Sequence, residues 1–196
     1  MIPAIVLAAG ASSRMGAAKP LLRVHGETFI RRILTTLREG GVAAAVVVVR
    51  PGEADLEREI AEVGFGRSVV NSQPERGQLS SLVIGLDAVE SPAVTAVLVT
   101  LVDVPLISPT TVAALLQRTH STTAPIVRAV YRGRHGHPVI FTRAVFDALR
   151  RTDPGSGAKP VLWAYPPDDL EVGDAGVAED IDTPDDYTRL IPSPGK

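Results

Sequence analysis

Residues 2–22 read IPAIVLAAGASSRMGAAKPLL, and this stretch decides the fold class. It begins with a continuous apolar run over 2–8, which is typical of a strand buried on both faces of a parallel sheet. The run passes into a loop of small residues that carries two cations, Arg14 and Lys19. Ligands of open α/β sheets bind at the carboxyl ends of strands, so this loop is the expected place for a binding site.

Beyond this stretch, apolar runs alternate with helical patterns along the chain. Strands are predicted over 42–50, 67–71, 94–103, 124–131 and 137–142, and helices over 27–41, 53–63, 81–89, 108–119 and 143–151. This alternation predicts a three-layer α/β/α fold with a mainly parallel, Rossmann-like sheet. The most apolar run, 94–103, is expected to be the central strand. Residues 180–182 are expected to be extended, with a helix that begins after Thr183-Pro184.

Length and composition limit the class of protein. The chain has 196 residues, 45% of them hydrophobic, which suits one domain over 1–191 followed by a disordered tail over 192–196. A net charge of −2 argues against a nucleic-acid partner, and the absence of cysteine excludes disulfides. No basic leader and no run long enough to span a membrane are present, so we expect a cytoplasmic protein without a membrane partner.

The loop after the first apolar run has the chemistry of a phosphate cradle. Gly10 and Gly16 let the backbone approach a ligand closely and turn its N–H groups outward. Arg14 and Lys19 would add positive charge to those amides. The spacing matches neither the dinucleotide fingerprint nor the P-loop, which argues against a Rossmann dehydrogenase. A plain strand-to-helix connection with solvated cations remains the alternative on residue chemistry alone.

Five motifs together extend this interpretation to the whole chain. LAAGASSRMGAAK (7–19) meets every fixed position of the signature L-A-[AG]-G-x-S-x-R-M-G-x-x-K, and GQLSSL (77–82), LVDVPLI (101–107), GHPVIF (136–141) and DIDTPDDY (180–187) follow in the order of the same family. The chain, from residue 4 to about residue 190, thus resembles the MobA-like nucleotidyltransferases, and above all the molybdenum cofactor cytidylyltransferases.

This resemblance implies a nucleotidyltransferase fold and a Mg²⁺-dependent reaction. CMP would pass from CTP to the phosphate of a molybdopterin-type acceptor, with release of pyrophosphate. A molybdoenzyme or its chaperone would be the protein partner. The acceptor rests on the resemblance alone, because no residue between 120 and 175 identifies a pterin by its chemistry.

The resemblance also assigns roles to individual residues. Arg14, Lys19 and Asp103 would be catalytic, and the nucleotide would be bound by Leu7, Ala8, Ala9, Gly10, Arg14, Lys19, Ser80, Ser81 and Asp103. Asp103 and Asp182 would hold the metal, with Asp180 as the alternative to Asp182. His137 and Lys159 would face the acceptor. Simple turn capping by Asp103 and helix capping by the serines are the structural alternatives.

Differences in two motifs favour a pyrimidine base. Relatives that use guanine nucleotides tend to have leucine-alanine-glycine-glycine in the first motif and proline-leucine-alanine-glycine in the second, whereas this chain has Ala8-Ala9 and Ser80-Ser81. Use of GTP by a guanylyltransferase, an acceptor that is a sugar phosphate or another phosphorylated alcohol, and a non-catalytic nucleotide-binding module are the alternatives.

Overall fold

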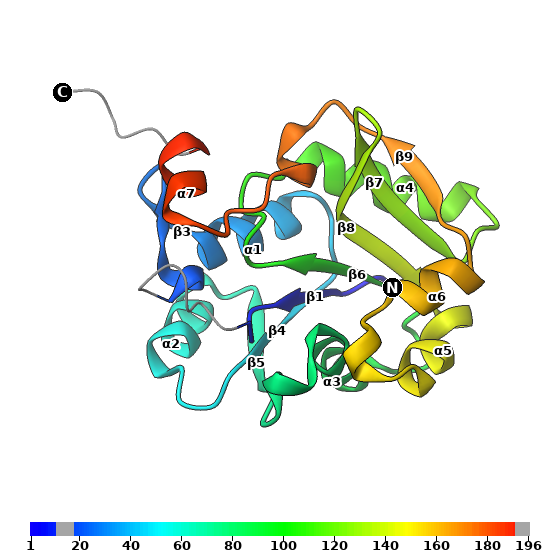
Figure 1. Cartoon of the computed structure of the whole chain (residues 1–196), viewed down its shortest axis with the longest axis horizontal. Helices are drawn as coiled ribbons and strands as arrows, with labels where there is room; N and C mark the ends of the chain where they lie inside the picture. Colours follow the sequence, from blue (N-terminus) through cyan, green and yellow to red (C-terminus); the bar gives the residue numbers. More distant parts are fainter. Residues whose placement is uncertain (11–17, 191–196) are drawn as a thin grey trace.

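A seven-stranded sheet forms the centre of the computed structural model, which describes residues 1–10 and 18–190 (Figure 1). The strands lie in the order β5-β4-β1-β6-β8-β7-β9. Their bounds are β1 (Ala4–Leu7), β4 (Ala45–Val49), β5 (Gly66–Val70), β6 (Ala96–Leu101), β7 (Ile126–Tyr131), β8 (Arg134–Thr142) and β9 (Asp168–Glu171). β8 runs antiparallel to β6 and β7, and the other neighbouring strands of this sheet are parallel. The predicted mainly parallel sheet is confirmed, and β6 takes the predicted central position.

Helices cover both faces of this sheet, as the alternation of patterns predicts. They are α1 (Phe29–Glu39), α2 (Ala54–Val63), α3 (Gln78–Val89), α4 (Pro109–Ser121), α5 (Phe146–Arg151) and α6 (Lys159–Ala164). A further helix, α7 (Pro184–Leu190), contributes Tyr187 to a separate small cluster with Val24 and Phe29. Ala4 and Val6 of β1 belong to one core with α1, α2 and α4, whereas Ile5 and Leu7 belong to a second core with α3, α5 and α6. Successive strand residues point to opposite faces, so one apolar strand supplies both cores. The three-layer α/β/α fold is confirmed.

The start of α1 differs from the prediction by two residues. Instead of starting the helix, residues 27–28 form β3 (Glu27–Thr28), which pairs with β2 (Arg23–Val24) in a short antiparallel hairpin. The hydroxyl of Thr28 then accepts a hydrogen bond from the Arg31 N–H at 3.2 Å and caps α1. Ser108 caps α4 in the same way, with Pro109 at the first helical position as predicted.

The start of α3 matters more for the site. The helix begins at Gln78, three residues before the predicted range 81–89 and within RGQLSSL (76–82), the stretch expected to open it. Gly77 lies directly before the helix with φ of 99°, a conformation that suits glycine. It follows a short 3₁₀ turn over Pro74–Arg76. Ser80 and Ser81 therefore lie inside the first turn of the helix, where their side chains are buried.

Two differences concern the last third of the chain. β9 has the polar sequence DDLE and was not predicted; it pairs with β7, where Arg128 forms an ion pair with Asp169 at 2.8 Å. The expected strand through Asp180–Asp182 is wrong, because these residues belong to no strand. Ile181 is fully buried there, and its N–H donates to the carbonyl of Asp103 at 2.8 Å.

The predicted start of α7 is confirmed. The hydroxyl of Thr183 accepts from the Asp186 N–H at 3.1 Å, and the Asp186 carboxylate accepts from the Thr183 N–H at 3.0 Å. This reciprocal arrangement is a capping box just before Pro184.

Some predictions fall on the undescribed parts of the chain. Arg14 and Gly16, and the predicted tail 192–196, lie outside the described residues, so the single domain over 1–191 stays a prediction. Within residues 1–10 and 18–190, every helix is too short or too polar to cross a lipid bilayer.

Candidate active site

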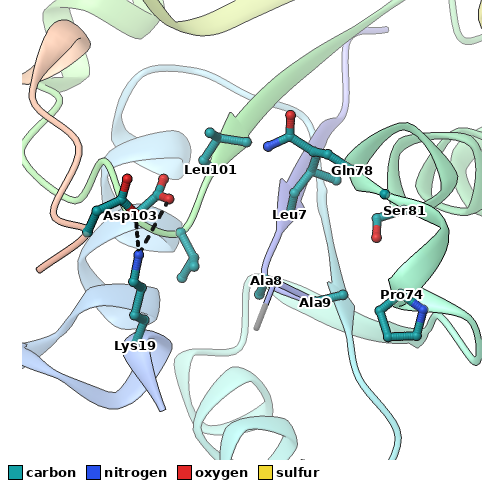
Figure 2. A pocket seen from close by; sticks show the side chains of 13 residues that line it. Leu7, Ala8, Ala9, Lys19, Pro74, Gln78, Ser81, Leu101 and Asp103 are labelled. Carbon is teal, nitrogen blue, oxygen red and sulfur yellow. Dashed lines mark hydrogen bonds and ion pairs between the residues drawn. The ribbon is translucent and has the colours of Figure 1, made fainter. Parts of the chain in front are cut away.

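A pocket of about 260 Å³ opens at the carboxyl ends of β1 and β6, beside the first turn of α3 (Figure 2). It is lined by Leu7, Ala8, Ala9, Gly10, Lys19, Pro74, Gly77, Gln78, Ser81, Leu101, Val102, Asp103 and Asp182. Figure 2 shows a charged end with Lys19 and Asp103, and an opposite end where Ala9, Pro74 and Ser81 lie. The place of the pocket agrees with the rule for open α/β sheets.

Lys19 connects two carboxylates that are far from it in sequence. It begins the 3₁₀ turn Lys19–Leu21, in which Pro20 is buried. Its Nζ donates a hydrogen bond to Oδ1 of Asp182 and lies 3.9 Å from Oδ2 of Asp103. Only 12% of the lysine side chain is exposed, so solvent screens its charge weakly. The structure thus brings together Lys19, Asp103 and Asp182, as the sequence predicts.

Asp103 has the environment of a functional carboxylate. It follows β6, and burial raises the pKa of its side chain to about 6, with the charge of Lys19 acting in the opposite direction and Asp180 and Asp182 adding to the rise. Its Oδ1 is buried and has no hydrogen-bond partner among the described residues. A buried carboxylate oxygen without a partner is costly unless it binds something else.

That unpartnered oxygen is the observation that fits a divalent cation. Mg²⁺ is commonly held by one or two carboxylates together with phosphate oxygens of the substrate, rather than by a complete cage of protein ligands. Asp103 and Asp182 could supply the two carboxylates, and they agree with the predicted metal residues. The described residues contain no group of three or more acidic or histidine side chains arranged to hold a metal by themselves.

The two serines of the second motif have different surroundings. Ser81 lines the pocket, whereas Ser80 does not and instead lines a smaller cavity on the other side of the α3 start. The hydroxyl of Ser80 donates to the Gly77 carbonyl at 2.7 Å and accepts from the Asn71 amide at 3.1 Å. The Ser80 side chain, predicted to contact the nucleotide, therefore lies outside this pocket, because consecutive residues of a helix point in different directions.

A second pocket of about 400 Å³ adjoins the first and shares Leu7, Gln78 and Leu101 with it. His137 and Lys159, both predicted to face an acceptor, line this second pocket. Its floor is apolar, and further charged residues on its wall are Arg128, Arg134 and Asp180. Two adjoining pockets with residues in common can hold two substrates side by side.

The protonation equilibrium of His137 is shifted by its surroundings in the second pocket. Burial lowers its pKa to about 4, and its Nδ1 lies 3.5 Å from the Val99 carbonyl oxygen. The ring is therefore neutral near pH 7. Asp180, the alternative metal ligand, lines the second pocket rather than the first; burial and the neighbouring charge of Asp182 raise its pKa.

Sequence reasoning missed several residues of the two pockets. Gln78 lines both pockets and lies at the end of the polar loop after β5, and that position near a strand's carboxyl end was the available signal. Arg128 and Arg134 lie on β7 and β8, where nothing in the sequence distinguished them from surface arginines. The remaining predicted nucleotide-binding residue, Arg14, lies outside the described residues.

Comparisons with known proteins agree with this geometry. A family model described as the MobA-like NTP transferase domain matches residues 4–168. A curated relative, nicotine blue oxidoreductase from Paenarthrobacter nicotinovorans, is 30% identical over 97% of this chain and 96% of its own length.

Among solved structures, Rv0371c from Mycobacterium tuberculosis H37Rv superposes with a TM-score of 0.85 at 31% identity, covering 98% of this chain and 97% of that one. A structure of Rv0371c in complex with manganese gives a TM-score of 0.81 at 28% identity, covering 98% and 99%.

Proposed function

The chain belongs to the family of MobA-like NTP transferase domains, and from this premise we propose that it transfers CMP from CTP to the phosphate of a molybdopterin-type acceptor. The observation that carries the proposal is the pair of adjoining pockets, one with Lys19 and Asp103 and the other with an apolar floor and a cationic wall. A triphosphate fits the first kind of environment, and a phosphorylated heterocycle fits the second. The proposal includes a cytoplasmic location and a molybdoenzyme or its chaperone as recipient.

The reaction is an in-line displacement at phosphorus. An oxygen of the acceptor phosphate would form a bond to the α-phosphorus of CTP, and the bond from that phosphorus to the bridging oxygen of the β-phosphate would break. The electron pair leaves with pyrophosphate. A phosphate monoester has its second pKa near 6 and is already largely a dianion at neutral pH, so no general base is needed.

Catalysis then depends on alignment and on charge neutralisation. Lys19, together with Arg14, would bind the β- and γ-phosphates and stabilise the negative charge that develops on the departing pyrophosphate. Asp103 and Asp182 would hold Mg²⁺, which supplies further charge neutralisation when it is bound. The weak solvent screening of Lys19 makes its contribution larger than that of a surface lysine.

The residues at the end of the first pocket that lies away from Lys19 support a preference for CTP over GTP. Ala9 adds a methyl group where relatives that use guanine nucleotides tend to have glycine, so a one-ring base fits more easily. Ser81 lines the same pocket and offers a hydroxyl to a polar base edge. Of the two serines of this motif, Ser81 alone lines the pocket, so the proposed contact with the base is assigned to Ser81.

The test is release of pyrophosphate by the full chain with Mg²⁺, molybdopterin and each of CTP, GTP, ATP and UTP. We expect kcat/KM for CTP to exceed that for GTP at least about tenfold, which corresponds to about 1.4 kcal/mol. Equal or better use of GTP would favour the guanylyltransferase alternative. Reaction only with sugar phosphates or other phosphorylated alcohols would overturn the acceptor, and nucleotide binding without pyrophosphate release would favour a binding module.

An oxidoreductase is a second candidate, favoured by the name of the full-length relative from P. nicotinovorans. The matched assay follows oxidation of NADH and NADPH by the same protein preparation in the presence of nicotine blue. We expect no turnover above that of the Lys19→Met variant. Reduction of nicotine blue that persists without any nucleoside triphosphate would favour the second candidate over the first.

A further inference from the structure

A buried asparagine lies directly behind the nucleotide pocket. Asn71 follows β5, is 1% exposed, and is held in the sheet register by its backbone N–H, which donates to the Val49 carbonyl at 2.9 Å. Its side-chain amide donates to the hydroxyls of Ser80 at 3.1 Å and Ser81 at 2.9 Å. Asn71 was absent from the residues predicted to act in the site.

The orientation of this amide follows from its partners. The Gln73 N–H lies 2.9 Å from Oδ1 of Asn71 and can only donate, so the oxygen of the amide must be on that side. The two N–H groups of the amide must then face the two serines. Because the side chain is buried and all its groups are used, this orientation is costly to reverse.

The consequence for each serine is that one lone pair of its oxygen accepts from Asn71, so the hydroxyl hydrogen cannot point towards Asn71 and must be donated elsewhere. Ser80 donates to the Gly77 carbonyl, which also accepts from the Ser80 backbone N–H at 3.1 Å. That carbonyl is thereby occupied. Among the described residues no acceptor takes the hydrogen of Ser81, whose side chain lines the nucleotide pocket.

We propose that Asn71 is a positioning residue that fixes the Ser81 hydroxyl as a hydrogen-bond donor to the nucleobase. The site then selects a base that presents an acceptor, a ring carbonyl oxygen or an unprotonated ring nitrogen, at Ser81. A base that presents an amino group at this point can use only the second lone pair of Ser81, which leaves the Ser81 hydrogen without an acceptor and makes binding weaker. This inference rests on the proposed function, because it assumes that the pocket binds a nucleotide.

The variant that tests the proposal is Asn71→Asp, which replaces an amide that donates with a carboxylate that accepts. The Gln73 N–H keeps its partner, but the Ser81 hydrogen now turns towards residue 71 and leaves only lone pairs for the base. We expect the Kd of Mg²⁺-CTP, measured by calorimetry, to rise about tenfold, a change typical of one lost hydrogen bond. Where pyrophosphate release is followed, KM should rise with the Kd, while kcat changes less than threefold. This is expected when a contact is lost equally from the ground state and the transition state.

A double-mutant cycle separates positioning from a general structural effect. Ser81→Ala alone should raise the Kd about tenfold, and Asn71→Asp combined with Ser81→Ala should be no weaker than the weaker single variant. Ser80→Ala is the matched control, because Ser80 shares the Asn71 amide but does not line the pocket; its Kd should stay within twofold of wild type. If Asn71→Asp does not fold, the isosteric Asn71→Leu takes its place in the same cycle.

The outcomes distinguish this proposal from the proposed function. Effects of Asn71 and Ser81 that multiply in the double variant, or a Ser80→Ala variant as weak as Ser81→Ala, would overturn the positioning role while wild type still binds CTP. Failure of wild type to bind any of CTP, GTP, ATP or UTP would overturn both. Tight binding of CTP without transfer to molybdopterin would overturn the proposed acceptor and leave the role of Asn71 supported.

Discussion

At the scale of single residues, Lys19 is the group whose replacement should affect the chemical step most directly. Lys19→Met removes the cation between Asp103 and Asp182, and we expect kcat to fall about a hundredfold, since a donor to developing charge is worth that much in other enzymes. Lys19→Arg should recover only part of the loss, because guanidinium and ammonium differ in shape and hydration. Steady-state pyrophosphate release measures both variants, and a change confined to KM would show that Lys19 only binds substrate.

Asp103, Asp182 and Asp180 form a second comparison between residues. Asp103→Asn should lower kcat at least about a hundredfold, because the oxygen without a partner is the best-placed ligand for a cation. Asp182→Asn should raise the Mg²⁺ concentration needed for half-maximal rate, and Asp180→Asn should leave that concentration unchanged, since Asp180 lines only the second pocket. Titration of Mg²⁺ with each variant decides; a larger shift for Asp180→Asn would reverse the assignment of the second ligand.

At the scale of elements, the packing of α3 against the sheet determines where Ser81 and Gln78 lie. Gly85 faces the sheet, and a Cβ placed there would lie 2.4 Å from Ile5 Cγ2 and 3.1 Å from Val48 Cγ2. Alanine is the better helix former, but this overlap must displace the helix or the strands. We expect Gly85→Ala to lower the free energy of unfolding in urea by about 1–3 kcal/mol and to raise the KM for CTP.

Gly173→Ala is the control for this prediction, because no atom lies within 4 Å of a Cβ built at that position. Its stability should stay within about 0.5 kcal/mol of wild type. Equal stability of the two variants would mean that α3 tolerates a wider spacing from β1 and β4 than the packing implies.

The elements also show where sequence reasoning succeeds and where it stops. β1 and β6 were predictable because strands buried on both faces are continuous apolar runs. β9 was not predictable, since its residues are polar and it pairs with β7 where Arg128 and Asp169 meet from distant parts of the chain. The side-chain direction of Ser80 depends on the start of α3 at Gln78. Helix boundaries depend on local features such as the positive φ of Gly77.

At the scale of the whole molecule, the first and last motifs meet through tertiary contacts that periodicity does not reveal. Lys19 and Asp182 are 163 residues apart, and the hydrogen bond from Ile181 to the Asp103 carbonyl holds the segment that carries Asp182 beside the end of β6. The family motifs predicted that these residues share a site. The division into two pockets, and the asparagine behind Ser81, required the folded arrangement.

The stability of the whole molecule should carry the signature of His137 as pH falls. Its pKa is about 4 in the folded protein against an ordinary value of 6.5, so between these values the unfolded chain binds a proton that the native protein does not. Stability contributed by the neutral ring is therefore complete above pH 6.5 and is lost as pH falls towards 4, with a slope approaching about 1.4 kcal/mol per pH unit. Asp103, whose pKa is raised, contributes a slope of the opposite sign, but it is common to wild type and variant, so the difference between the two proteins isolates His137.

Urea unfolding at pH 8.0, 6.5, 5.5 and 4.5, with EDTA present, compares wild type with His137→Gln. At pH 8.0 the difference records lost packing alone, and we expect it to shift in favour of the variant at each lower pH. A constant difference across the series would mean that the imidazole is protonated as easily in the folded protein as in the unfolded chain.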